Sequence, residues 1–407
     1  MTAATARPAA QSHRPYLHEI DLMRVIFIGG VLLNHTTTIF QSQMTSSGEI
    51  RLGLLATHLM IHFTRMGFMF MTGLVLMLAY FAKDIHWPTF YLKRFKTVTV
   101  PYILWNTILL VGATALGLGA FTWASFGSTY ALALLHGNQF YLYYLMVTMQ
   151  LYLAFPLLRL LFKKTAHHGR ILLTSFLLQL VIVAGIKYGL PHVDTSSWLW
   201  WFRAYGVNVF TYQFYFVAGA YTTLHYQQVV AFIDRHIKAI AAATGVLSLG
   251  TIGLYAFNRL VLGMSHTAAV SPHQPYMAVY DVLMIMTVFW LGRRYAAWRQ
   301  TTSRHGWDRL IQNGAKVSFG IYLCQTIAVS LLGGALGALN LSDGALLLLL
   351  PAGYMFVLGL SFLIAWFCYR VAPFGWLIGR PQRGPGVKKG VLDHEYPHRS
   401  TVSATDQ

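Results

Sequence analysis

Long apolar segments alternate with short polar ones over most of the chain. Ten segments are long and apolar enough to be candidate membrane-spanning helices, since roughly twenty apolar residues cross the hydrocarbon core of a bilayer. They are residues 22–40, 57–82, 98–119, 139–162, 171–189, 207–225, 237–257, 276–292, 317–338 and 346–370. The sixth is rather polar for such a helix. The pattern predicts an all-α, polytopic integral membrane protein of about ten transmembrane helices.

Composition supports a chain that is solvated by lipid. Hydrophobic residues make up 56% of the sequence and charged residues only 10%, against roughly 25% charged residues in an ordinary soluble domain. The formal net charge of +18 would suggest nucleic acid as the partner of a soluble protein. Here the basic residues lie in short loops between apolar segments, so the lipid bilayer explains them better and we expect no nucleic-acid partner.

The distribution of Lys and Arg predicts the orientation. If the N-terminus is cytoplasmic, 25 of these residues fall on the inside and 4 on the outside, which is the asymmetry that orients membrane proteins. We therefore expect a multi-pass protein of the cell membrane with both termini cytoplasmic. Residues 1–20 would form an N-terminal tail, 21–372 a membrane domain, and 373–407 a basic, disordered cytoplasmic tail.

Polar residues follow one face of the first predicted helix. Asp21, Arg24, Ile28, Val31 and His35 recur in steps of three and four, which places them on one side of a helix. Arg24 and His35 would then lie roughly 16 Å apart along the axis. Arg24 could simply anchor the helix by pairing with Asp21, and His35 could be a hydrogen-bonded core residue. Intramembrane polar residues nevertheless often mark functional sites.

The second predicted helix repeats this feature. His58, His62 and Arg65 share one face, and two His residues four positions apart can hold a metal ion. No Asp or Glu completes a ligand set, so we expect a polar face along an outward cavity and no metal. Farther on, the small pair Thr72-Gly73 would allow close packing against another helix.

Three cations precede the third predicted helix. Lys93, Arg94 and Lys96 lie in residues 90–102, which we expect to form a loop leading into that helix at Pro101. Such a cluster at the cytoplasmic end of a span is commonly only a topology signal. It could also bind an anionic nucleotide or phosphate, because guanidinium and ammonium groups make charge-assisted hydrogen bonds to phosphate oxygens.

Six fragments in order resemble the acyltransferase-3 family of membrane acyltransferases over most of residues 17–370. They are Leu17–His35 with its Arg-x10-His spacing, Phe68–Gly73, Lys93–Tyr102, Phe140–Pro156, Phe214–Gly219 and Ser318–Leu323. The match has departures, since Gln150 stands where some members carry Glu and Gln325 where His often occurs. The resemblance covers a stand-alone membrane domain, without an extracellular esterase domain.

The resemblance implies an enzyme, an O-acyltransferase that transfers groups other than aminoacyl groups. It would move an acyl group, usually acetyl, from cytoplasmic acyl-CoA to a hydroxyl of an envelope or extracellular glycan. By the same resemblance His35 would be catalytic with Arg24 as its motif partner, and Arg94, Lys93 and Lys96 would hold the donor phosphates.

On chemical grounds Arg65 would stabilise developing negative charge, with His62 beside it in the acceptor part of the site. Two other functions remain open. One is an exporter or flippase of a polysaccharide or lipid-linked sugar, whose translocation path would use the same polar stripe. The other is a binding protein or sensor without chemistry.

Overall fold

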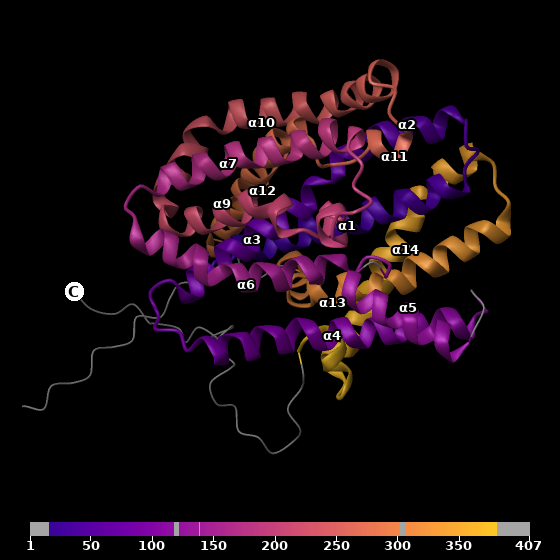
Figure 1. Ribbon diagram of the computed structural model, residues 1–407, viewed down its shortest axis with the longest axis horizontal. Helices are drawn as coiled ribbons and strands as arrows, with labels where there is room; N and C mark the ends of the chain where they lie inside the picture. The colour runs from indigo at the N-terminus through magenta and orange to yellow at the C-terminus, as the bar shows by residue number, and fades with distance from the viewer. Residues whose placement is uncertain (1–15, 118–121, 138, 302–305, 381–407) are drawn as a thin grey trace, which may run out of the picture.

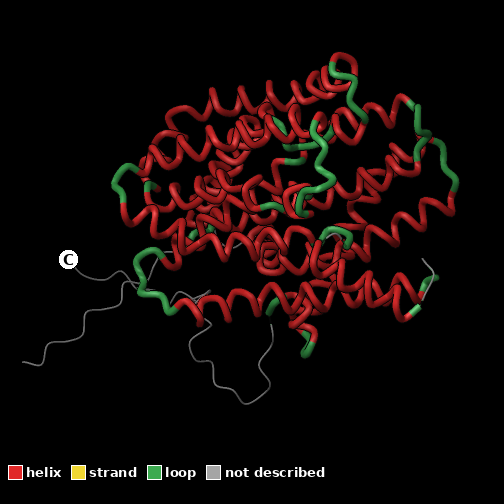
Figure 2. Tube along the Cα trace, viewed as in Figure 1, coloured by secondary structure: helices red, strands yellow, loops and turns green. Residues whose placement is uncertain are grey.

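The structure, a computed structural model, describes residues 16–117, 122–137, 139–301 and 306–380. Of the predicted tails at 1–20 and 373–407, residues 1–15 and 381–407 lie outside the described residues. The described chain consists of helices and loops and contains no strand (Figure 2). The first half comprises α1 (Glu19–Gln43), α2 (Glu49–His58), η1 (Leu59–Ile61), α3 (Phe63–Tyr80), α4 (Trp87–Ala115), α5 (Trp123–His136), α6 (Tyr143–Lys164), α7 (His168–Ala184), η2 (Gly185–Gly189) and η3 (Leu190–His192). The second half comprises α8 (Trp200–Arg203), η4 (Tyr205–Val207), η5 (Val209–Tyr212), α9 (Gln213–Leu224), α10 (Tyr226–Ala256), η6 (Phe257–Val261), α11 (His266–Ala269), α12 (Pro275–Thr301), α13 (Gly306–Leu339), α14 (Asp343–Arg370) and η7 (Phe374–Ile378).

Nine helices in the described part of the chain are long and apolar enough to cross a membrane. They correspond to nine of the ten predicted segments, so the prediction of an all-α polytopic membrane protein is confirmed. In Figure 1 they run in roughly one direction across the view, with α10 along one side, α4 along the other, and α1 and α3 between them. The exact number of crossings stays a prediction.

The sixth predicted segment, 207–225, does not form one continuous helix. Its first residues form short turns, and α9 has only 12 residues. The Gln150 side chain of α6 satisfies the irregular backbone: its Nε2 donates to the Val207 carbonyl at 2.7 Å, and its Oε1 accepts from the Val209 N–H at 3.2 Å. Gln179 of α7 similarly donates to the Thr211 carbonyl at 2.8 Å. Non-helical backbone is tolerated at membrane depth only with such partners.

Contacts between helix ends place several of them on one side of the bundle. The Tyr226 hydroxyl at the start of α10 donates to Glu19 at the start of α1, at 2.5 Å. The rings of His168, at the start of α7, and His225, just before α10, are joined by a 2.9 Å hydrogen bond. The chain therefore travels out along α7 and returns through α9 before α10 begins.

Two glycines bring α3 and α9 into close contact. A Cβ at Gly73 would overlap the Phe216 carbonyl, and a Cβ at Gly219 would overlap the Phe70 carbonyl. The absence of both side chains lets the two backbones approach, which is the usual role of small residues between membrane helices. The close packing expected at Gly73 is thus present. It fixes α9 beside α3, whose first turns carry Arg65.

Candidate functional site

One cavity of about 180 Å³ opens between α1, α3, α6 and α13. It is lined by Arg24, Val31, Asn34, His35, His62, Thr64, Arg65, Phe68, Tyr143, Tyr144, Ser318, Phe319 and Tyr322. Polar and aromatic groups dominate this lining although the surrounding helices are apolar. A hollow with a few convergent polar groups is the usual form of a binding site for a small molecule.

The predicted stripe on the first helix faces this cavity. Arg24, Val31 and His35 all line it, whereas Ile28 of the same stripe is buried at 2% exposure and packs in the core. The cation and the imidazole therefore share one hollow, about three helical turns apart on α1. The helical periodicity predicted this arrangement, but not which helices complete the walls.

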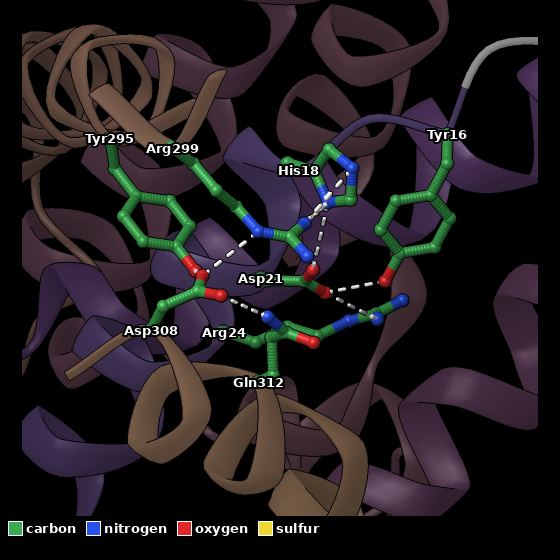
Figure 3. Close-up of polar contacts among 8 residues, drawn as sticks. All are labelled: Tyr16, His18, Asp21, Arg24, Tyr295, Arg299, Asp308 and Gln312. Atoms are coloured by element: carbon green, nitrogen blue, oxygen red, sulfur yellow. Dashed lines mark hydrogen bonds and ion pairs between the residues drawn. The ribbon is translucent and has the colours of Figure 1, made fainter. Parts of the chain in front are cut away.

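Arg24 is also part of an ion pair. Its Nη1 lies 3.8 Å from Oδ1 of Asp21, and the same Asp21 oxygen accepts a hydrogen bond from the Tyr16 hydroxyl at 2.6 Å (Figure 3). The Asp21 side chain is almost fully buried, whereas the Arg24 side chain is 29% exposed. Arg24 thus anchors the end of α1 by pairing with Asp21, which is one interpretation of the sequence. It also lines the cavity, which the interpretation as a functional residue required.

A second ion pair lies beside the first and joins α12 to α13. Arg299 Nε is 2.9 Å from Asp308 Oδ1, and Asp308 is 1% exposed. Tyr295 and Gln312 also donate to this carboxylate, at 2.7 and 2.5 Å. Arg299 in turn contacts His18, which precedes α1, as Figure 3 shows. The network fixes the ends of three helices around the Arg24 end of the cavity.

His35 is held by an aromatic ring. Its imidazole lies against the Tyr141 ring at a tilt of 30°, with the ring centroids 3.6 Å apart, and it has no hydrogen-bond partner among the described residues. The carbonyl of Tyr141 accepts a hydrogen bond from the Tyr322 hydroxyl. Phe140, the preceding residue, has φ of 50°, in the left-handed region that non-glycine residues rarely adopt. Such strain commonly occurs at functional sites.

Arg65 brings a second cation into the cavity. Its Nη1 donates to the Tyr212 hydroxyl at 3.3 Å, and its guanidinium carbon lies 4.9 Å from the centre of the Tyr143 ring. Within the described chain no carboxylate lies within 4 Å of it. His62 lines the same cavity, with its ring 4.8 Å from that of His58. No cluster of three or more His, Cys, Asp or Glu suited to a metal occurs in the part that the structure describes.

The predicted basic loop is helical. Residues 90–102 fall inside α4, which begins at Trp87, so the prediction of a loop before the third helix is wrong. Pro101 lies within that helix and does not start it. The segment Trp87-Pro88 explains the difference, because Pro is favoured in the first turn of a helix and the residues after it can continue the helix.

The three cations of this segment do not line the cavity. Lys93 and Lys96 are exposed, while Arg94 points between aromatic rings. Arg94 Nη2 donates to the Tyr80 hydroxyl at 3.2 Å, and its guanidinium carbon lies 5.9 Å from the Tyr152 ring. The structure therefore brings Arg24, His35, His62 and Arg65 together and leaves the basic cluster of α4 outside this group.

Sequence reasoning missed most of the aromatic wall. Tyr143, Tyr144, Phe319 and Tyr322 were recognised only as parts of family landmarks, without a role. Their type and spacing resemble those of ordinary core residues, so no local signal separated them from the core.

Comparison with known proteins gives one match. A family model described as an acyltransferase domain matches residues 17–370, nearly the whole chain. No curated protein and no solved structure matches the chain.

Proposed function

We propose a specific activity on the premise that this chain belongs to the acyltransferase-3 family and is a multi-pass membrane acyltransferase. We infer that it transfers an acyl group, acetyl in the first instance, from acyl-CoA taken from the cytoplasm. The acceptor is a hydroxyl of an envelope or extracellular glycan, and the membrane is the cell membrane.

The shared cavity of Arg24 and His35 carries this proposal. The cavity has a volume of about 180 Å³. Such a space accommodates an acyl group and its thioester, while the nucleotide of the donor stays outside. An acyl group presented from the Arg24 end would reach His35 within the membrane.

The side chains around the cavity suit acyl transfer to a hydroxyl. A neutral His35 imidazole would take the proton of the acceptor hydroxyl as its oxygen attacks the thioester carbonyl. The carbon–sulfur bond then breaks, and the departing thiolate takes up the proton to give the free thiol. Arg65, which has no carboxylate within 4 Å in the described chain, would stabilise the oxyanion, with His62 beside the acceptor.

The basic cluster of α4 is the proposed site for the donor phosphates. The Nε of Arg94 is buried without a hydrogen-bond partner in the described chain. Lys93 and Lys96 are exposed on the same helix. The exposed ammonium groups are available to phosphate oxygens, and Arg94 would join them by turning from the tyrosine ring and hydroxyl that it contacts now.

The decisive test is an acyl-transfer assay on His35→Gln at matched membrane abundance. Gln can form hydrogen bonds but cannot take up the proton, so we expect a loss in rate of roughly 10²–10⁴. His136→Gln is the matched control, because His136 also stacks on an aromatic ring, that of Trp200 at 3.9 Å, but does not line the cavity. Near wild-type turnover in His35→Gln would contradict the proposal. Intact glycan export without transfer activity would favour the exporter.

A further inference from the structure

A short segment after the last long helix folds back onto the bundle. Residues 371–380, here called the C-terminal hook, include η7 and fall where the sequence predicted the start of a tail. The Trp105 indole of α4 donates to the Leu377 carbonyl at 2.9 Å. Ile378 is 2% exposed and packs against Gly320 of α13. The hook is therefore anchored to two helices, one of which carries the basic cluster and the other a wall of the cavity.

Gly379 shows how closely the hook approaches both α4 and α13. It has φ of 66°, in the left-handed region that favours glycine, and a Cβ there would overlap the Thr97 carbonyl of α4. The same Cβ would lie 3.3 Å from the ring of Phe319, which lines the cavity. Lys96 precedes Thr97, and Arg380 follows Gly379. The hook thus brings its backbone at Gly379, the residue before Arg380, against both Thr97 of α4 and Phe319 of the cavity wall.

The hook contributes an aromatic ring and a cation to the region where it meets α4. Trp376 lies under Lys96, with Nζ 5.0 Å from the ring centre. Arg380 is partly exposed, and only its backbone N–H, which donates to the Gly375 carbonyl at 2.8 Å, has a hydrogen bond in the described chain. Neither Lys96 nor Arg380 has a carboxylate within 4 Å among the described residues. Cations without acidic partners bind phosphate, and an indole can stack on a base.

We propose that the C-terminal hook forms a phosphate-binding site in which Trp376 and Arg380 face Lys96 and hold the phosphorylated adenosine of the donor. This rests on the proposed function, because it names a second side of the donor site. The position next to Phe319 puts the nucleotide outside the cavity, with the acyl end free to enter it. An anionic lipid headgroup presents the same phosphate chemistry, so the test separates the two sources.

The test measures binding of CoA itself, which cannot turn over, to the full chain in nanodiscs of zwitterionic lipid. Arg380→Gln removes the charge without breaking any side-chain hydrogen bond or ion pair within the described chain, so folding should be unaffected. We expect the affinity for CoA to fall about 10-fold, the effect of losing one charge-assisted hydrogen bond. Trp376→Leu should also weaken binding.

The matched control uses another cation that lies over a tryptophan ring, on α12. Arg294 lies over Trp290 on α12, with 5.7 Å between the guanidinium carbon and the ring centre, and neither residue belongs to the hook or lines the cavity. Arg294→Gln and Trp290→Leu should bind CoA like wild type. If they weaken binding as much as the hook variants do, general surface charge explains the effect and the site is refuted.

Two further comparisons are needed. One separates failure of the hook proposal from failure of the donor site on α4, and the other separates a nucleotide from a lipid headgroup as the ligand. If Arg94→Gln weakens CoA binding while Arg380→Gln and Trp376→Leu do not, the hook proposal is wrong and the donor site on α4 stands. If none of the three variants weakens it, the donor site of the proposed function fails as well. Loss of co-purified anionic lipid from Arg380→Gln, with CoA binding unchanged, would overturn the nucleotide assignment in favour of a headgroup.

Discussion

At the scale of single residues, the two ends of the cavity are held by different contacts. A buried carboxylate pairs with Arg24, while His35 is held by its stack on Tyr141 and has no hydrogen-bond partner in the described chain. A catalytic imidazole is more often oriented by a hydrogen bond that its ring N–H donates to a carboxylate or carbonyl oxygen. Here the close, tilted contact with Tyr141 restricts the rotation of the ring, and the Tyr322 hydroxyl fixes Tyr141 through its carbonyl.

This arrangement predicts a difference between two substitutions at Tyr141. Tyr141→Phe keeps the stacked ring and should retain most activity. Tyr141→Leu leaves the imidazole free to rotate, and we expect kcat to fall about 10- to 100-fold, since a small misplacement of a reacting group is costly. KM for acyl-CoA should change little, because the stack lies away from the donor cations. Steady-state kinetics on both variants measures this split.

The control for this prediction is Trp200→Leu. It removes a close stack on another histidine, that of Trp200 on His136, which does not line the cavity. Its kinetics should match wild type. Equal losses in Tyr141→Phe and Tyr141→Leu would show that the phenol hydroxyl matters and the stack does not.

At the scale of elements, α9 and the short turns that precede it support the site although they do not form one continuous helix. Tyr212, directly before α9, accepts a hydrogen bond from Arg65, and α9 packs on α3 through paired glycines. The preceding turns depend on Gln150 for their backbone hydrogen bonds. Gln150 stands where some family members carry Glu, and the structure explains the glutamine. Its amide can both donate and accept a hydrogen bond, as these turns require.

The glycine contact gives a prediction about stability. In Gly219→Leu the new side chain meets the Phe70 carbonyl, so α9 has to move away from α3. Overpacking of this kind usually costs about 1–3 kcal/mol, and backbone contact puts this case at the upper end. We expect a lower thermal unfolding midpoint in detergent.

Gly245→Leu provides the comparison for this measurement. Gly245 lies exposed on α10, and a Cβ there would meet nothing within 4 Å. Its unfolding midpoint should stay near that of wild type. A midpoint for Gly219→Leu equal to that of Gly245→Leu would mean that α3 and α9 do not need this close approach.

At the scale of the whole molecule, many of the cations predicted to lie on the cytoplasmic side lie over aromatic rings. Such contacts occur for Lys83, Arg94, Lys96, Arg159, Lys163, Arg294, Lys316 and Arg370. An aromatic ring stabilises a cation without neutralising its charge. The predicted cytoplasmic side of the bundle therefore keeps a positive potential, which attracts anionic lipid and a polyanionic donor.

The charge distribution predicts the orientation of the bundle. A reporter fused at residue 125, in α5, should lie outside, and one fused at residue 405 should lie in the cytoplasm. The physical reason is that positively charged loops are retained on the cytoplasmic side. Paired alkaline phosphatase and fluorescent protein fusions measure the side of each position. Two reporters on the same side would show that the helix count or the orientation is wrong.

The helices and the cavity-facing stripe of α1 were predictable because both arise from local periodicity. Apolar runs specify spans in lipid, and steps of three and four placed Arg24 and His35 on one face before any neighbour was known. The start of α4 was mispredicted because charged residues were taken as a loop signal. The helix α5 was also missed, although Thr122 caps it with a reciprocal pair of hydrogen bonds to Ser125.

The sequence by itself determined the class of the protein, the long helices and the polar stripe, since each depends on residues close together along the chain. Tertiary structure decided which helices enclose the stripe, that Tyr141 stacks on His35, and that the C-terminal hook reaches α4. These contacts join residues far apart in sequence, such as Gly379 and Thr97. Their energies come from the packing of complementary surfaces, and single-sequence periodicity carries no information about which surfaces meet.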